Sequence, residues 1–164
     1  MAVIEAIETV YLEADAASVT FSSLGSYEHL QLRVSTIGTS TLQNGIFYLN
    51  GDTTGGNYAR HYMQGSDTTP FAAAVTGSSM WGLVPETEAK PVYGWAVIDI
   101  LAYRNANKNT TLMSVYGGTA VSPYLQFISS LWDSTAAVTS VQVLPSSGSF
   151  GRGSEFTLFG LASS

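Results

Sequence analysis

Two histidines are the first residues in this 164-residue chain whose type could carry chemistry. Neither His29 nor His61 stands in the His-Glu-x-x-His pattern with which a helix binds zinc. His29 opens an alternating segment and belongs to its polar side, so we expect it at the surface. His61 lies between Arg60 and Tyr62, and we expect a structural role for it.

Asp99 is the one acidic residue inside the most apolar segment, residues 94–103. In a strand it shares a face with Trp95 and Leu101. A buried carboxylate needs hydrogen bonds or a cation, and Arg104 is the expected partner. A general acid with a perturbed pKa is the alternative, but glycoside hydrolysis needs two carboxylates about 5–10 Å apart. We therefore favour a structural aspartate near the edge of a sheet.

Oxygen-bearing side chains gather in residues 50–57, as they do in calcium loops. This segment has one carboxylate, Asp52, and lacks the spacing of an EF-hand, so we predict a turn. Residues 77–81 have tryptophan where a nucleophile elbow needs its second glycine, and no phosphate-binding Walker sequence occurs. Residues 148–153 are glycine-rich with no helix predicted after them. We expect no catalytic residue, no cofactor and no metal site.

The three tryptophans are candidates for a platform on which a sugar would stack. We expect Trp95 in the core because its segment is apolar throughout. Trp81 lies in an irregular region and is the best candidate for exposure, although a packing role is favoured.

Short strands separated by turn residues must position these groups. In residues 29–35, Leu30, Leu32 and Val34 alternate with polar residues, which is the period of a half-buried strand. Asn-Gly pairs at residues 44–45 and 50–51 supply the positive φ angles of tight turns. Further strands are predicted at residues 17–24, 46–49, 58–63, 110–116, 124–132, 138–144 and 155–161.

Residues 94–103 are apolar on both faces and predict a central strand that is covered on both sides. Residues 64–91 are less regular, and we expect a long loop with one or two short strands, or a short helix at residues 71–75. The pattern predicts an all-β fold with about nine or ten short strands. We expect a two-sheet, jelly-roll-like β-sandwich.

The first sixteen residues are predicted as an N-terminal arm or an edge strand, followed by a single β-sandwich domain over residues 17–164. Residues 8–12 are typical of a strand, although Ile4, Ile7 and Tyr11 would also line one face of a helix. An arm laid on a neighbouring subunit would bury its apolar residues. The candidate interface residues are Ile4, Ile7, Val10, Tyr11 and Trp81.

Charge and cysteine content exclude several classes of function. Charged residues make up 11% of the chain and its net charge is −6, with six scattered Lys and Arg. A basic footprint is therefore missing, and we expect neither nucleic acid nor an anionic membrane as partner. The chain has no cysteine and no basic region typical of a signal peptide, which fits synthesis in a reducing cytoplasm.

Four segments together resemble small proteins encoded by tailed bacteriophages. They are Leu49-Asn50-Gly51-Asp52 with Asn57-Tyr58, residues 97–109, residues 131–141, and residues 153–160, which end Thr157-Leu158-Phe159-Gly160. The likeness spans residues 17–161 and is a pattern of strands and turns. It implies a virion structural protein, either a capsid decoration (cement) protein or a tail-associated β-sandwich, and it carries no functional residues to transfer.

We therefore expect a non-enzymatic capsid decoration protein that binds and stabilises the assembled bacteriophage head. The expected partners are the major capsid protein and other copies of the chain, as a homotrimer at local threefold axes. The protein would be made in the host cytoplasm and reside in the virion. The alternative is a tail or fibre component, or a carbohydrate-binding module, that contacts the host surface.

Overall fold

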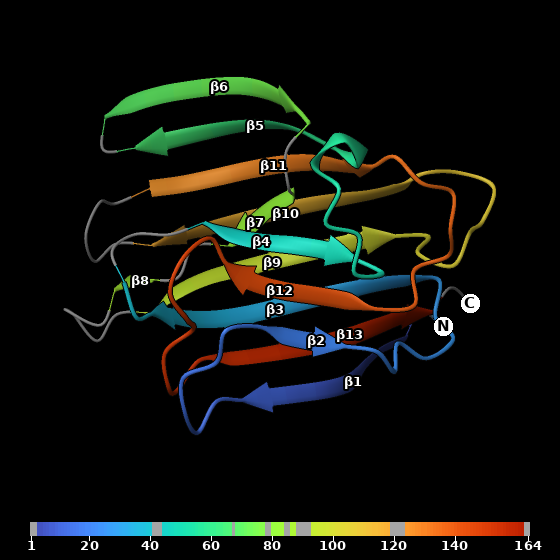
Figure 1. Ribbon diagram of the computed structural model, residues 1–164, viewed down its shortest axis with the longest axis horizontal. Helices are drawn as coiled ribbons and strands as arrows, with labels where there is room; N and C mark the ends of the chain where they lie inside the picture. The colour runs from blue at the N-terminus through green and yellow to red at the C-terminus, as the bar shows by residue number, and fades with distance from the viewer. Residues whose placement is uncertain are drawn as a thin grey trace.

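The computed structural model describes residues 3–40, 44–66, 68–77, 80–83, 86–87, 93–118 and 124–162. These residues fold into two β-sheets that lie one over the other (Figure 1). Within them there is no α-helix, and η1 (Gly55–Asn57) is a single 3-10 turn. The predicted all-β, two-sheet sandwich is confirmed.

The larger sheet has eight strands in the order β1-β13-β3-β9-β10-β11-β5-β6, all antiparallel to their neighbours in that order. The two-residue β8 pairs in parallel with β3 outside this order. The bounds are β1 (Val3–Tyr11), β3 (His29–Gly38), β5 (Tyr58–Ser66), β6 (Thr69–Thr76), β8 (Glu86–Thr87), β9 (Gly94–Leu101), β10 (Thr110–Gly118), β11 (Tyr124–Trp132) and β13 (Glu155–Ala162).

The smaller sheet has the order β2-β12-β4-β7, with bounds Val19–Phe21, Val141–Pro145, Gly45–Leu49 and Met80–Leu83. The chain passes repeatedly between the two sheets: β1 and β3 belong to the larger sheet, and β2 and β4 belong to the smaller one. Such crossovers are typical of jelly rolls. In the view of Figure 1, β5 and β6 project beyond the edge of the smaller sheet.

β4 ends at the tight turn that the Asn-Gly pair at residues 50–51 predicted. Asn50 and Gly51 follow this strand with φ angles of 54° and 68°. Asparagine and glycine tolerate this left-handed conformation, whereas most residues with a Cβ are strained there. The turn directs the chain from β4 toward η1 and β5.

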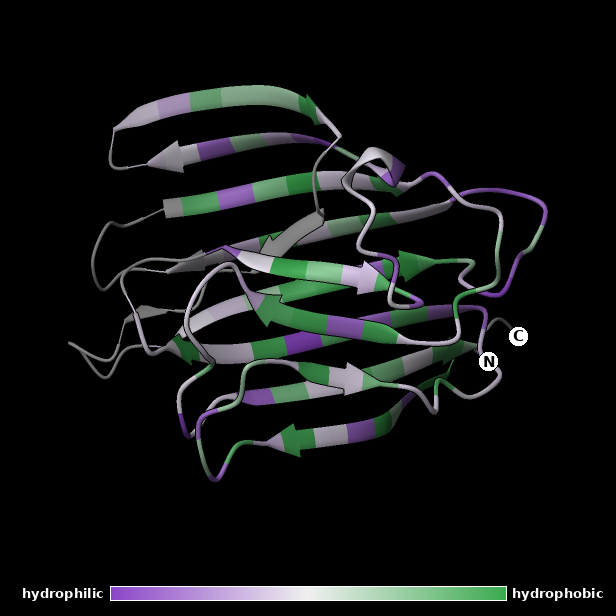
Figure 2. Ribbon diagram, in the orientation of Figure 1, coloured by the Kyte–Doolittle hydropathy of each residue, from purple (hydrophilic) through white to green (hydrophobic). Residues whose placement is uncertain are grey.

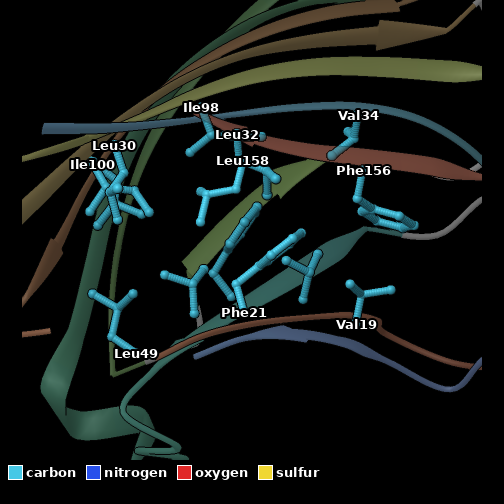
Figure 3. Close-up of a cluster of buried hydrophobic side chains, with 14 of the residues drawn as sticks. Val19, Phe21, Leu30, Leu32, Val34, Leu49, Ile98, Ile100, Phe156 and Leu158 are labelled. Atoms are coloured by element: carbon cyan, nitrogen blue, oxygen red, sulfur yellow. The ribbon is translucent and has the colours of Figure 1, made fainter. Parts of the chain in front are cut away.

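The core lies between the two sheets and is built from alternate strand positions. Leu30, Leu32 and Val34 of β3 are buried as the alternating pattern predicted. Figure 3 shows Phe21 and Leu49 of the smaller sheet pointing toward these side chains. In Figure 2, hydrophobic and hydrophilic residues alternate along β3 and β12. Burial of one residue in two therefore holds each sheet to the other.

The middle of the chain is more regular than predicted. β5 continues to Ser66, and β6 occupies residues that we expected as loop or as a short helix. The prediction of a short helix at residues 71–75 is wrong. This alanine-rich segment is a strand because it pairs with β5, from Ser66↔Thr69 to Ala59↔Thr76. With β7 and β8, the described residues form thirteen strands. Ser78, Ser79 and residues 84–85 and 88–92 lie outside the described part.

β9 is central in the larger sheet, between β3 and β10. Its buried residues Ala96, Ile98 and Ile100 face the smaller sheet. The expectation that the strand is covered on both sides is wrong. The smaller sheet covers one face, and the alternate residues of β9 lie on the other.

Candidate functional site

The face of the larger sheet that points away from the smaller sheet is called here the outer face. Six of its exposed large apolar side chains come from four adjacent strands, β9, β10, β11 and β5. Their exposed fractions lie between 40% and 62%, for Trp95, Leu101, Met113, Leu125, Phe127 and Met63. A soluble domain rarely exposes so many large apolar side chains on one surface unless the surface has a partner.

Strand register places the apolar residues of the outer face in continuous rows across five strands. One row joins Val97, Val115, Phe127, Met63 and Ala72, from β9 to β6. Adjacent strands lie about 4.8 Å apart, so this row is about 19 Å long. It contains no polar side chain.

A second apolar row runs parallel to the first, through Trp95, Gly117, Leu125, Gly65 and Pro70. A Cβ at Gly65 would meet no atom within 4 Å. The missing side chain contributes to a depression of about 520 Å³ that Leu125 and Pro70 help to line. The two rows together form a shallow apolar surface with a hollow near β6.

A polar strip on β3 borders the apolar rows. Arg33 Nε donates to Gln31 Oε1 at 2.8 Å, and Gln31 Nε2 donates to Asp99 Oδ1 at 2.8 Å. The Arg33 guanidinium also lies 5.0 Å from the ring centre of Phe159, a cation–π distance. The predicted pairing of Asp99 with Arg104 is wrong, because the cross-strand register brings Gln31 opposite Asp99.

The two histidines lie in different parts of the larger sheet and have different neighbours. His29 accepts the backbone N–H of Ala102 at Nδ1 over 2.8 Å, which anchors the turn after β9. Its side chain is 36% exposed, in accord with the predicted surface position. His61 is exposed on the outer face, in register with Ser129 and Ala74.

The loop at residues 50–57 is held by hydrogen bonds to one carboxylate. Asp52 accepts from the backbone N–H of Thr54 at 2.9 Å, from Asn57 Nδ2 at 2.8 Å and from Trp132 Nε1 at 2.8 Å. These donors stabilise the ionised form and lower the pKa of Asp52 to about 2. The carboxylate is already satisfied by its own loop and by Trp132, so it fastens the loop to β11.

Tyr58 fixes the other side of this loop. Its hydroxyl donates to the backbone carbonyl of Asp52 at 2.6 Å and accepts from the backbone N–H of Leu49 at 3.4 Å. Burial raises the pKa of Tyr58 to about 12. The phenol therefore stays protonated and structural over the whole physiological range of pH.

A buried polar cluster joins β10, β11 and β5 on the face toward the core. Tyr116 donates to Gln126 Oε1, and Gln126 Nε2 donates to Gln64 Oε1 at 2.6 Å. Arg60 is 6% exposed in the same strand as Gln64, and burial lowers the pKa of its guanidinium. The cluster ties three strands together and presents no nucleophile with a neighbouring base.

The two tryptophans whose side chains are described, Trp95 and Trp132, lie on opposite faces of the larger sheet and do not form a platform together. Trp95 is 45% exposed on the outer face, so the prediction of a core position for it is wrong. Trp132 is 3% exposed on the opposite face of the sheet, where its indole binds Asp52. Trp81 lies in β7, with its backbone in register with Ile46, and its side chain is outside the described part.

The candidate interface at the N-terminus divides between two environments. Residues 3–11 form β1, an edge strand paired with β13 of the same chain. Ile7 and Val10 are partly buried against the core, whereas Ile4 and Tyr11 are more than half exposed. The strand therefore contributes both to its own sheet and to the surface.

Sequence reasoning missed most of the outer face, including Met63, Met113, Leu125 and Phe127. The signal is present in β11, where apolar residues occur at both alternations of residues 124–132. The same pattern in β9 was interpreted as burial on both sides, although one side is open.

Comparisons with known protein families, curated proteins and solved structures found no match. Among the described residues, no three His, Cys, Asp or Glu side chains gather as metal ligands, and no helix has the length and apolar character needed to span a bilayer. The outer face is thus the feature of the described surface that departs most from an ordinary soluble domain.

Proposed function

We propose that this protein is a structural component of a tailed-bacteriophage virion, a capsid decoration protein that binds the assembled head with its outer face. The observation that supports a docking role is the pair of apolar rows across β9, β10, β11, β5 and β6. The phage assignment rests on the sequence resemblance.

The apolar surface suits the centre of a larger contact. The two rows cover five strands, about 19 Å, and two outward positions along each strand, about 14 Å, so their area is about 270 Å². An apolar area of this size forms the centre of an interface whose rim is polar. The surrounding polar strip on β3 would form the rim of the contact, as in other protein interfaces.

Low charge supports attachment to a crowded shell. Charged residues make up 11% of the chain, so much of its surface carries no charge that would have to be desolvated in a contact. The homotrimer expected from the sequence is a separate prediction that competes with the dimer inferred below, and the mass of the free protein distinguishes the two.

The test is binding to empty heads assembled from the major capsid protein encoded in the same genome. We expect the purified protein to sediment with these heads, and Phe127→Glu to abolish this because it places a charge in the middle of the apolar row. Thr20→Glu is the matched control, since it adds the same charge at an exposed position of β2 in the smaller sheet.

Binding that is equal in wild type, Phe127→Glu and Thr20→Glu would refute docking through the outer face. Failure of the wild type to bind heads would refute the decoration role. Should the protein then bind glycans, and lose that binding in Trp95→Ala, the exposed tryptophan would support the carbohydrate-binding alternative instead.

A further inference from the structure

The two described sheets have four edges, and three of them are protected against pairing with another strand. β2 and β7 have three and four residues, which is too short to offer a useful template. β1 is longer, but it carries exposed Glu5 and Glu8 and a register shift between Ala6 and Glu8. Charges and bulges of this kind keep edge strands from pairing.

The fourth edge, β6, has none of these protections, and its one proline, Pro70, lies at its start and leaves Phe71 to Thr76 open. Its sequence Thr-Pro-Phe-Ala-Ala-Ala-Val-Thr has no charge, and it pairs with β5 without any shift of register. Phe71 is 51% exposed, and it lies on the face of the larger sheet opposite to the outer face. A long, apolar, regular edge strand is a template for an added strand.

One hydrogen bond shows which backbone N–H and C=O groups of β6 point toward β5 and which point toward the open edge. The N–H of Gly77, directly after β6, donates to the carbonyl of Tyr58 in β5. Backbone groups alternate along a strand, so odd-numbered residues face β5 and Ala72, Ala74 and Thr76 face the open edge. Pro70 fits this pattern, because proline is tolerated where no N–H is needed by the neighbouring strand.

We propose that two copies of this chain join through the open edges of β6, in an antiparallel pair centred on Ala73. This register pairs Ala72 with Ala74 of the second copy through backbone hydrogen bonds, in both directions. It also sets Phe71 opposite Val75, an aromatic and β-branched pair that stabilises sheets, and symmetry repeats the contact. Only Pro70 lacks a donor within it.

A second copy fits this edge because antiparallel pairing of a strand with itself closes on a twofold axis. The same surface serves both partners, and the two β6 edges are used up. Pairing β6 with the protected β1 edge would instead build an open filament. The residue at the axis pairs with itself, so the twofold axis is perpendicular to the sheet and both outer faces point the same way.

This inference does not depend on the proposed virion role, and its first test is the mass of the free protein. Analytical ultracentrifugation should give about twice 17.4 kDa. Ala74→Pro should yield a folded monomer, since it removes an N–H at the open edge, as Pro70 already does. Ala74→Thr is the matched control and should remain dimeric, because it keeps the N–H and favours strand.

The register can be tested by cross-linking, because the chain has no cysteine of its own. At Ala73 the two Cα atoms would lie about 4.5 Å apart in a non-hydrogen-bonded pair, within reach of a disulfide. Ala73→Cys should therefore form a covalent dimer under mild oxidation much faster than Ala72→Cys. Random collision predicts the reverse, because Ala72 is exposed and Ala73 is only half-exposed.

Several outcomes would overturn the proposal. A wild-type monomer at the highest attainable concentration, a trimer, or an open polymer would each do so. A dimer that persists in folded Ala74→Pro would show that another surface joins the copies. Should Ala74→Pro fail to fold, faster cross-linking of Ala72→Cys than of Ala73→Cys would still refute the register.

Discussion

Gly160 of β13 leaves space that the ring of Tyr27 fills, and Gly160→Ala is the sharpest test of this packing. A Cβ at residue 160 would lie within 3.0 Å of three ring atoms of Tyr27. Tyr27 is partly buried against the core, and its hydroxyl donates to Glu5 of β1 at 2.9 Å. The ring therefore has to leave its place when the alanine is introduced.

The expected loss can be worked from the surface that the ring exposes. If half of the ~200 Å² of a tyrosine side chain returns to water, about 2.5 kcal/mol is lost at ~25 cal/mol per Å². Alanine offsets part of this, because glycine inside a strand costs about 0.5–1 kcal/mol. We expect Gly160→Ala to lower the free energy of unfolding by about 2 kcal/mol, and the Tm by about 4–8 °C.

Urea denaturation followed by tryptophan fluorescence measures this loss. Gly65→Ala is the matched control: it makes the same substitution in a strand of the same sheet, where a Cβ meets no atom within 4 Å. We expect Gly65→Ala to leave the stability unchanged or to raise it by up to about 1 kcal/mol.

A double variant isolates the clash. When Tyr27 is already alanine, Gly160→Ala should cost almost nothing further, so the two effects should be far from additive. A loss below about 0.5 kcal/mol in the single variant, which is typical of neutral surface positions, would refute the reasoning. Simple additivity of the two losses would refute it as well.

Three further predictions concern the loop carboxylate, the core and the absence of catalysis. The pKa of Asp52 is lowered to about 2, so its contribution to stability is complete above its ordinary pKa of 3.8 and is lost as the pH falls through about 2. Between these two pH values, the urea midpoint should therefore fall less steeply in Asp52→Asn than in the wild type. Equal slopes in the two proteins would contradict this prediction. Ile100 is fully buried, so Ile100→Ala should cost about 2–5 kcal/mol in the same denaturation assay, and a loss under about 0.5 kcal/mol would place β9 at the surface. Incubation with polysaccharides or peptidoglycan should release no product by reducing-sugar assay; turnover that disappears in Asp99→Asn would show that a catalytic site exists.

The local sequence pattern was sufficient to predict strands of which one face is buried and the other is exposed to solvent. The alternation of Leu30, Leu32 and Val34 marked both the strand and its core face, because side chains point to opposite faces with a period of two. The turn at Asn50 and Gly51 was equally local, since few residues accept positive φ. Fold class followed from many such segments.

Pairing between distant segments decided what local pattern could not. The alanines of β6 suit a helix, and only the register with β5 makes them a strand. Asp52 was identified as a loop carboxylate, but its partner Trp132 is 80 residues away in sequence. Arg104 was a plausible partner for Asp99 by proximity in the chain, whereas the register of β3 with β9 supplies Gln31.

The sequence by itself determined that this chain is an all-β sandwich and that β9 is a central strand. Only the tertiary structure decided which faces stay open. Apolar residues at both alternations, as in Trp95 and Ile98, are compatible with cover on two sides or with one open face. The smaller sheet lies on one side alone, so Trp95 is left on a surface that the physics of burial favours covering with a partner.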